Sequence, residues 1–363
     1  MFGLGQKPFL GIDIGSTSVK TALLKKHKSG YELASFGMVP LPPDTIVDGE
    51  IENPEAIVEA IKNLLKSEKL THYKHAVFSV AGQSVIIKKI TVPLMSEDDL
   101  AESIQQEAEQ YIPFDIDEVN VDFQVVAAEG ELPKKGQKPA AGEERQMDVL
   151  LVAAKKELIA EQSRIITEAG LKPTVVDLDV FALENGAELT FGVDRGDTVA
   201  LVNIGATVTN INILERGVTA YTRDVSVGGS VVTIAIQKNM NVGFRDAESV
   251  KLGRLPEGMN KADVIRHIKT GVGQIAAELQ STFDMFHKTS ESRVRRVRLS
   301  GGGAMLEGID TLIGQELGLD CDVINPFKNL KINSRQFDQE YLDTIAPMAV
   351  VAVGLATRTL EDK

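Results

Sequence analysis

One turn motif occurs twice in this chain and constrains its fold more than any other feature. At residues 10–24 an apolar run is interrupted by Gly-Ser-Thr-Ser and then resumes, which predicts two strands joined by a tight turn. The same pattern returns at 200–214, shifted by 190 positions. The identical pairs are Ile14 and Ile204, Gly15 and Gly205, Thr17 and Thr207, and Leu24 and Leu214. A hairpin repeated once in each half predicts two related halves that face each other across a cleft.

Each turn has the chemistry of a phosphate-binding loop. Gly15 and Gly205 let the main chain approach a ligand closely, and the adjoining N–H groups and hydroxyls can bond to a phosphate. Asp13 ends the first strand, where its carboxylate could hold Mg²⁺ through water. Buried strands also end in Asp-x-Gly turns for structural reasons, so this pattern alone leaves both interpretations open.

A run of three glycines, Gly301 to Gly303, follows the expected strand Val297-Arg-Leu-Ser300. Three consecutive glycines cost backbone entropy that an ordinary turn does not require. They are typical of a place where a flat ligand lies against the main chain. A flexible loop between a strand and a helix is the alternative.

The composition excludes several functions. The net charge of −13 argues against nucleic acid, whose phosphates need a basic surface. The single cysteine, Cys321, rules out an intrachain disulfide and a multi-cysteine metal site. No apolar run reaches about 18 residues, so we expect a cytoplasmic protein without a transmembrane segment. The segment 271–276 matches a dinucleotide-binding fingerprint only formally, because helix rather than strand is expected before it.

With two phosphate turns followed by a glycine loop, the chain resembles the superfamily of actin, sugar kinases and Hsp70. Within it, the chain is most similar to the PilM family of type IV pilus assembly, a relative of the division protein FtsA. The stretches that carry this resemblance are 11–20, 90–95, 104–114, 223–229, 300–304 and 346–356. The resemblance implies an α/β, actin-like (ribonuclease H-like) two-domain fold with duplicated βββαβα halves and an inserted small α+β subdomain.

The resemblance also implies four subdomains. In chain order of their first residues, these are the first actin-like subdomain at 1–82 plus 346–363, the inserted subdomain at 83–169, the second actin-like subdomain at 170–235 plus 298–345, and a nucleotide-cleft subdomain at 236–297.

Three further segments have predictions of their own. A helix from about 97 to 111, capped by Ser96 and Asp99, is expected in the insertion. The polar segment 129–146 should be mobile. The Ala- and Val-rich segment 347–360 should form a final helix, tightly packed in the core.

The cofactors implied by the resemblance are ATP and Mg²⁺, with Asp13 near the metal. The residues implied to contact the nucleotide are Asp13, Gly15, Ser16, Thr17, Ser18, Lys20, Asn203, Gly205, Ala206, Thr207, Gly228, Gly229, Glu248, Lys251, Gly301, Gly302, Gly303 and Ala304. Two of these predictions have a structural alternative. Lys20 could cover a strand edge, and Glu248 and Lys251 could be a simple ion pair one helical turn apart.

Asp179 is the candidate catalytic residue. It aligns with a carboxylate that begins the crossing helix of the superfamily and positions the attacking water. Asp is one methylene shorter than the usual Glu, and an N-cap role for the helix explains it equally well.

One position departs from active relatives of the superfamily, whose second turn usually carries Asp where this chain has Asn203. An amide supplies no charge to a metal-bound water. We therefore expect ATP binding with little or no hydrolysis. The alternatives are a slow Mg²⁺-dependent ATPase or kinase, and an FtsA-like filament-forming division protein.

The resemblance also implies the partners. The chain would bind the N-terminal cytoplasmic peptide of PilN, an inner-membrane protein, and would lie at the inner membrane through that partner. Contacts with the pilus motor ATPase and platform components, and assembly into a homo-oligomer or ring, are expected from the family.

Overall fold

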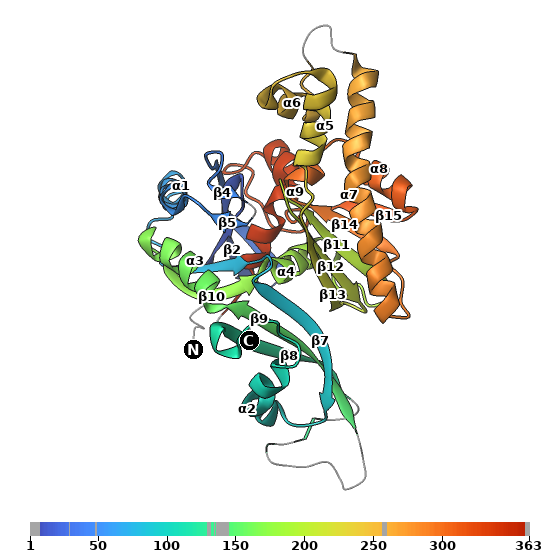
Figure 1. Ribbon diagram of the computed structural model, residues 1–363. Helices are drawn as coiled ribbons and strands as arrows, with labels where there is room; N and C mark the ends of the chain where they lie inside the picture. The colour runs from blue at the N-terminus through green and yellow to red at the C-terminus, as the bar shows by residue number, and fades with distance from the viewer. Residues whose placement is uncertain are drawn as a thin grey trace.

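The structure is a computed structural model that describes residues 8–28, 30–47, 49–128, 132–133, 135, 145–255 and 260–359 (Figure 1). Two five-stranded sheets form the body of the molecule, and a three-stranded sheet projects from it. The segment 129–146, which the sequence predicts to be mobile, lies mostly outside the described residues.

The first sheet has the strand order β10-β6-β1-β2-β3. Its strands are β1 (Leu10–Ile14), β2 (Ser18–His27), β3 (Gly30–Pro40), β6 (His75–Val80) and β10 (Lys172–Leu178). The first three form an antiparallel meander, to which β6 and β10 add in parallel. A small hairpin of β4 (Ile46–Val47) and β5 (Glu50–Ile51) leads to α1 (Pro54–Ser67), where the Asn53 side chain caps the helix by accepting from the Ala56 N–H.

The second sheet repeats this arrangement in the order β13-β12-β11-β14-β15. Its strands are β11 (Thr198–Ile204), β12 (Thr209–Glu215), β13 (Val218–Val225), β14 (Arg296–Ser300) and β15 (Asp320–Val323). Leu10 pairs with Leu23 in the first hairpin and Ala200 with Ile213 in the second, which is the shift of 190 positions read from the sequence. The duplicated α/β halves are therefore confirmed.

An inserted unit projects between β6 and α3 (Lys156–Glu168). Its antiparallel sheet has the order β7-β9-β8, made of β7 (Val85–Pro93), β8 (Val119–Ala128) and β9 (Gln146–Lys155). The helix α2 (Glu97–Ala108) packs on it, and a 3-10 turn spans Ile116–Glu118. The Ser96 hydroxyl caps α2 by accepting from the Asp99 N–H at 3.1 Å, but the helix ends at Ala108, short of the expected end near residue 111.

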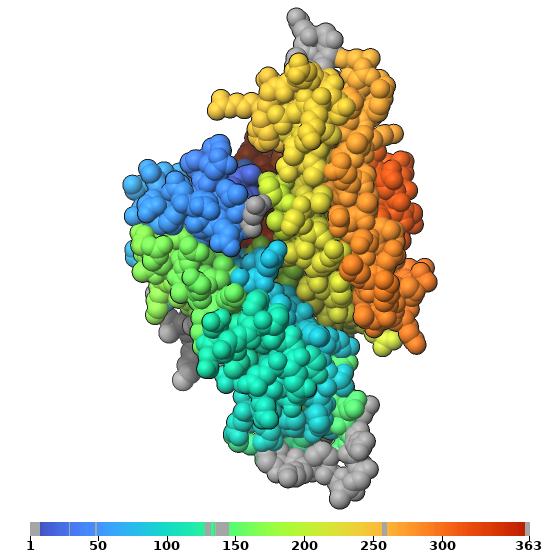
Figure 2. All heavy atoms as spheres, in the orientation of Figure 1, coloured from blue at the N-terminus to red at the C-terminus, as the bar shows by residue number. Residues whose placement is uncertain are grey.

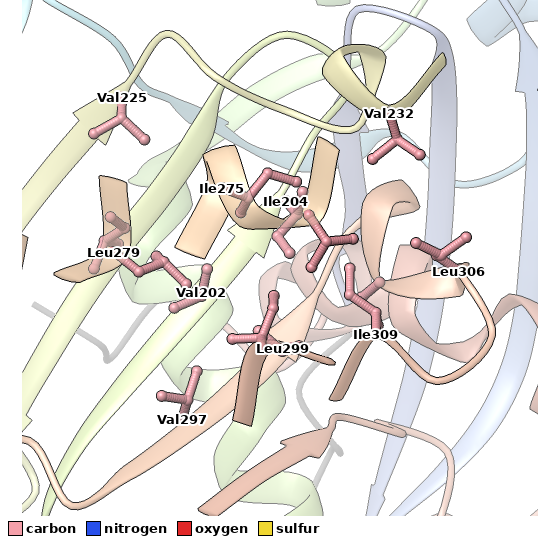
Figure 3. Packing of buried hydrophobic residues seen from close by; sticks show 14 of the residues in the cluster. Val202, Ile204, Val225, Val232, Ile275, Leu279, Val297, Leu299, Leu306 and Ile309 are labelled. Carbon is pink, nitrogen blue, oxygen red and sulfur yellow. The ribbon is translucent and has the colours of Figure 1, made fainter. Parts of the chain in front are cut away.

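In the second half, α7 (Lys261–Thr289) and α8 (Ile309–Leu317) pack against the sheet, while α5 (Ser230–Met240) and α6 (Phe244–Lys251) pack on α7 and on each other beyond the end of the strands (Figure 1). Figure 3 shows the core where Val202 and Ile204 of β11 meet Ile275 and Leu279 of α7. Burying an aliphatic side chain of this size stabilises the fold by about 1.5–3 kcal/mol. The segment 271–276 lies inside α7, which confirms that it is not a dinucleotide-binding turn.

Two helices, α4 (Asp179–Phe191) and α9 (Gln339–Leu355), cross unusually closely. Glycines make this approach possible. A Cβ added at Gly354 would lie 1.8 Å from the Ala182 carbonyl oxygen, and one added at Gly186 would lie 2.4 Å from the Val350 carbonyl oxygen. The backbones therefore touch with no side chain between them.

The final helix differs from its prediction. The sequence places its start at Pro347, but α9 begins at Gln339, and Pro347 lies inside it. The Asp338 side chain caps this earlier start by accepting from the N–H groups of Glu340 and Tyr341 at 2.9 and 3.4 Å. Proline usually ends or kinks a helix because it lacks an N–H donor, which explains the error. The expected burial is confirmed, since most of 345–355 is buried.

We expect Gly354→Ala to lower the free energy of unfolding by about 1–3 kcal/mol, because the added methyl overlaps the backbone of α4. Gly273→Ala is the matched control, since Gly273 is also inside a helix but has no atom within 4 Å of its added Cβ. That variant should gain about 0.5–1 kcal/mol from helix propensity. Urea unfolding of both variants measures this difference, and equal effects would contradict the close crossing.

Candidate functional site

The two repeated turns have the same backbone geometry. Gly15 N–H donates to the Ser18 carbonyl at 3.1 Å, and Gly205 N–H donates to the Val208 carbonyl at 2.9 Å. Thr17 and Thr207 are exposed at the tips, and Ser16 and Ala206 are half-buried beside them. Both turns thus present a short segment of backbone and one hydroxyl to solvent, as a phosphate-binding loop requires.

A buried ion pair lies directly behind the first turn. Lys20 Nζ is 3.0 Å from Asp13 Oδ2, across the hairpin from it, and both residues are more than nine-tenths buried. Lys20 therefore points inward instead of covering a strand edge. Within the residues that the structure describes, the hydroxyl of Ser18 in the same turn is buried without a hydrogen-bond partner. Such an orphaned group in a phosphate-type turn fits a site that receives a ligand.

The equivalent positions in the second hairpin carry amides. Asn203 and Asn210 pair across β11 and β12 as Asp13 and Lys20 pair across β1 and β2. Asn203 Nδ2 donates to Asn210 Oδ1 at 3.1 Å, and the Ser300 hydroxyl donates to Asn203 Oδ1 at 3.3 Å. The second turn thus has a neutral pair where the first has a charged one.

Asp179 lies at the first position of α4 and does not cap it. Its carboxylate instead accepts a 2.5 Å hydrogen bond from the Ser79 hydroxyl at the end of β6. Burial raises the pKa of Asp179 to about 7, with a further contribution from the negative charge of Asp13, while the bond from Ser79 acts in the opposite direction. The N-cap alternative is therefore wrong, and Asp179 lies near Asp13.

A third carboxylate reaches this region from the second half. Asp224 of β13 accepts from Asn210 Nδ2 at 2.9 Å and from the backbone N–H of Gly82 at 3.0 Å. Burial raises the pKa of Asp224 above its ordinary value, although these two hydrogen bonds act in the opposite direction. Its charge also contributes to the raised pKa of Asp179, so the two carboxylates lie close together although they belong to different halves.

The glycine loop packs on the second turn. A Cβ added at Gly301 would lie 2.4 Å from the Ile204 carbonyl oxygen, and one added at Gly303 would lie 2.3 Å from the Ile204 side chain. Gly301 also has a φ of 86°, a conformation that favours glycine. These two glycines are therefore required by packing. Gly302 is exposed, with only the tip of Met348 within 4 Å of an added Cβ, so it is the position open to a ligand.

Two adjacent glycines, Gly228 and Gly229, also contact the second turn; we call them the paired glycines. Gly229 N–H donates to the Gly205 carbonyl at 2.9 Å, and a Cβ added at Gly228 would lie 2.7 Å from that same oxygen. The loop between β13 and α5 thus lies directly against Gly205 and Ala206. The structure brings together the second turn, the paired glycines and the glycine loop, whose last residue, Ala304, is buried.

Glu248 and Lys251 form the ion pair that was the alternative interpretation of them, but they are not isolated on the surface. Lys251 Nζ lies 2.8 Å from Glu248 Oε1, 3.0 Å from Thr233 Oγ1 and 3.4 Å from the Gly229 carbonyl oxygen. The pair therefore ties α6 to the start of α5, next to the glycines at the turn. Figure 2 shows a hollow between this region, in yellow, and the first half, in blue.

The sequence did not single out four residues of this region: Ser79, Gly82, Asn210 and Asp224. Asn210 could have been found, because it stands 190 positions after Lys20. The other three act through contacts between segments about a hundred residues or more apart. Among the described residues, no group of three or more His, Cys, Asp or Glu side chains is arranged to hold a metal.

Two cavities of about 310 and 280 Å³ lie elsewhere, and Glu188 of α4 lines both of them. None of the residues predicted to contact the nucleotide lines them. In the second cavity, burial raises the pKa of Glu184 to about 7, and hydrogen bonds from Thr219 and Asn212 oppose this shift.

Comparison with known proteins first identifies the class of fold. A solved structure of MreB5 of Spiroplasma citri bound to AMPPNP has a TM-score of 0.52 at 12% identity, covering 96% of this chain and 94% of that chain. The fold is therefore actin-like, as the sequence predicts.

The family follows from closer matches. The family model of type IV pilus assembly protein PilM matches residues 11–360, so the chain belongs to that family. A solved PilM-PilN type IV pilus biogenesis complex is similar with a TM-score of 0.79 and 27% identity, over 97% of this chain and 98% of that chain. Cell division protein FtsA of Bacillus subtilis is 20% identical over 254 residues, which are 67% of this chain but only 57% of FtsA.

Across the part of the chain that the structure describes, we find no helix with the length and apolarity that a membrane span requires.

The raised pKa of Asp179 predicts a pH-dependent cost to stability. An unfolded Asp ionises near pH 4, but Asp179 in the folded protein keeps its proton until about pH 7, so stability falls as pH rises between these values. Asp179→Asn should therefore raise the free energy of unfolding at pH 8 by on the order of 1–2 kcal/mol, with little effect near pH 4. Urea unfolding at both pH values measures the change.

Asp148→Asn is the control of opposite sign. Burial alone would raise the pKa of Asp148, but hydrogen bonds from Lys89 and Thr91 outweigh it and lower that pKa overall. The ionised Asp148 therefore stabilises the fold. That variant should lose stability at pH 8. If Asp179→Asn instead destabilises the protein at pH 8, the ionised carboxylate of Asp179 is stabilised by its surroundings and the prediction is wrong.

Proposed function

We propose that this protein is a nucleotide-dependent scaffold of type IV pilus assembly. It binds ATP with Mg²⁺ in the cleft between its halves, hydrolyses it slowly or not at all, and binds the N-terminal cytoplasmic peptide of PilN. Family membership supports the role in pilus assembly, and the similar PilM-PilN complex supports the partner. Through that partner the protein would lie at the inner membrane, where motor ATPase and platform components are further candidate contacts.

The observation that carries nucleotide binding is the pair of matched turns, with an orphaned hydroxyl in the first. Backbone groups of 15–17 and 205–207 would hold phosphates, and the buried hydroxyl of Ser18 would gain a partner. Lys20 is suited to a phosphate oxygen, and Asp13 to water bound to Mg²⁺. Gly302 leaves room for the nucleoside beside the ion pair of α6. The AMPPNP-bound MreB5 structure supports a nucleotide for this fold.

The same geometry supports slow hydrolysis. Asn203 has no charge, and both ends of its amide are engaged by Asn210 and Ser300. Asp179 is held by Ser79, and with a pKa of about 7 it is only partly ionised at neutral pH. A general base has to be ionised and free to reach the water, and neither residue meets both conditions well.

Calorimetric titration with ATP and Mg²⁺, and separately with a synthetic peptide of the PilN tail, tests this proposal. We expect both ligands to bind and phosphate release to be negligible over hours. Asp13→Asn should weaken binding of ATP with Mg²⁺ by about tenfold, or about 1.4 kcal/mol, because the metal loses its carboxylate. Asp148→Asn, in the inserted sheet, should retain nucleotide affinity.

The results separate the alternatives. Steady phosphate release that depends on Asp13 would replace the scaffold by a slow ATPase or a kinase. Lipid-dependent polymers in sedimentation would favour the FtsA-like filament. A scrambled peptide that binds as well as the PilN sequence would remove the proposed partner.

A further inference from the structure

One end of the first sheet is strongly basic. β1, β6 and β10 run parallel to one another, and β2 runs antiparallel to β1 and leads into β3. The starts of β1, β6 and β10 therefore lie at the same end of the sheet as the connection between β2 and β3. The first phosphate-type turn, at 15–17, joins the other ends of β1 and β2, so the basic end is separate from the proposed nucleotide site.

Six exposed lysines belong to this end, and we call them the basic end. Three lie in the last residues of β2 or just after them, two stand at the starts of β6 and β10, and one lies on a segment packed beside β3. They are Lys25, Lys26, Lys28, Lys74, Lys172 and Lys331. Lys331 is tied to this end by its backbone, because its N–H donates to the Tyr31 carbonyl at 2.9 Å and its carbonyl accepts from the Leu33 N–H at 3.0 Å.

Little negative charge balances these lysines. Glu32 is the one acidic residue in the segments that form this end, which are 25–32, 71–75, 171–173 and 328–335. Its carboxylate is already engaged, because it lies 2.9 Å from Lys331 Nζ and 3.1 Å from His27 Nε2. Within the described part of the chain, the other five lysines form no ion pair. A chain whose net charge is −13 thus has one surface with an excess of positive charge.

Three acids lie three residues outside these segments, and each has a partner of its own. Glu68 accepts from the Ser35 hydroxyl at 3.4 Å, and Glu168 pairs with Arg164 at 3.6 Å. Asp338 caps α9 by accepting from two backbone N–H groups. The lysines of the basic end are therefore left to a partner outside the chain.

The corresponding end of the second sheet carries charges of both signs. Lys25 and Lys26 correspond to Glu215 and Arg216, 190 positions later in the sequence. Arg296, at the start of β14, lies within 3.6 Å of two aspartates. The duplicated fold therefore does not require lysines at this end of a sheet, and their accumulation in the first half needs a reason outside the fold.

We propose that the basic end contacts the surface of an anionic lipid membrane. Lysine is a strongly hydrated point charge on a flexible stem, whereas arginine suits a discrete ligand that it can bind with two parallel hydrogen bonds. An array made only of lysines, across a five-stranded sheet about 20 Å wide, fits a planar layer of anionic headgroups better than a single bound anion. Several cations near such a surface act together, since each one adds to the attraction.

This contact goes beyond the proposed function, in which the protein reaches the membrane through its partner alone. The acidic remainder of the chain is repelled by the same lipid surface, so the electrostatics favour one orientation. In that orientation the turn at 15–17, at the opposite end of the sheet, faces away from the lipid. The cleft then stays open to nucleotide while the protein is on the membrane.

Flotation with lipid vesicles tests the proposal on the full chain. We expect the protein to float with vesicles made of equal parts of phosphatidylglycerol and phosphatidylcholine, and to stay behind with vesicles of phosphatidylcholine alone. Binding should weaken as salt is raised, because the Debye length falls from about 10 Å at 0.1 M to about 3 Å at 1 M.

The duplicated hairpin supplies a matched pair of variants. Lys26→Gln should weaken binding to the anionic vesicles about fivefold, the effect expected of one charge near such a surface. Arg216→Gln, at the equivalent position of the second half, should leave it unchanged. The triple variant with glutamine at positions 25, 26 and 28 should lose more than tenfold. ATP affinity should be the same in all of them, because the turn at 15–17 lies at the opposite end of the sheet.

The outcomes separate this proposal from the proposed function. If the protein ignores the anionic vesicles, binds both kinds of vesicle equally, or loses as much affinity with Arg216→Gln as with Lys26→Gln, the lipid contact is overturned and the scaffold function stands. Self-association that needs these lysines in the absence of lipid, seen by sedimentation, would assign the surface to a second copy and overturn the lipid contact as well. If neither ATP nor the PilN peptide binds while the lysine-dependent flotation persists, the proposed function falls and the lipid contact stands.

Discussion

The close contact of α4 with α9 is the constraint on which the arrangement of the molecule depends. α4 carries the chain from the first sheet to the second, while α9 packs against β1 and β2 and contacts the glycine loop. The Pro347 carbonyl, inside α9, accepts from the Gly301 N–H at 2.7 Å. One helix thus touches the strands of the first turn and the loop of the second half. Because Gly186 and Gly354 have no side chains, the two helices are in direct backbone contact and hold these elements at a fixed distance.

On this framework, two hairpins with the same backbone have acquired different side chains. The register, the turn bond and the exposed threonine are shared. The pair behind the turn is Asp13 with Lys20 in one copy and Asn203 with Asn210 in the other. The two hairpins therefore share the shape of the turn but not its chemistry, because the pair behind the turn is charged in the first copy and neutral in the second.

The sequence predicts well whatever is local or repeated. The duplicated hairpins follow from their 190-residue shift, and the cap of α2 follows from Ser96 before an acidic first turn. The start of α9 was misplaced because the tertiary contact of the Pro347 carbonyl and the cap at Asp338 outweigh the usual effect of proline. For Asp179 and Asp224, partners 100 and 142 positions away decide the role, and no local pattern reveals such pairs. Glycine is needed at positions 301 and 303, as the sequence suggests, but the main reason is close packing against Ile204.

The buried pair of Asp13 and Lys20 has a consequence for how a charged ligand would enter. Each of these two charges already has its counter-ion, so the pair itself adds little net field at the first turn. Entry of a metal–nucleotide complex would be an exchange of ions: the ammonium would pass from carboxylate to phosphate, and the carboxylate from ammonium to the hydrated metal. Either component arriving alone would leave one buried charge uncompensated. The site would therefore select for metal and nucleotide together, through the cost of separating a pair that already exists.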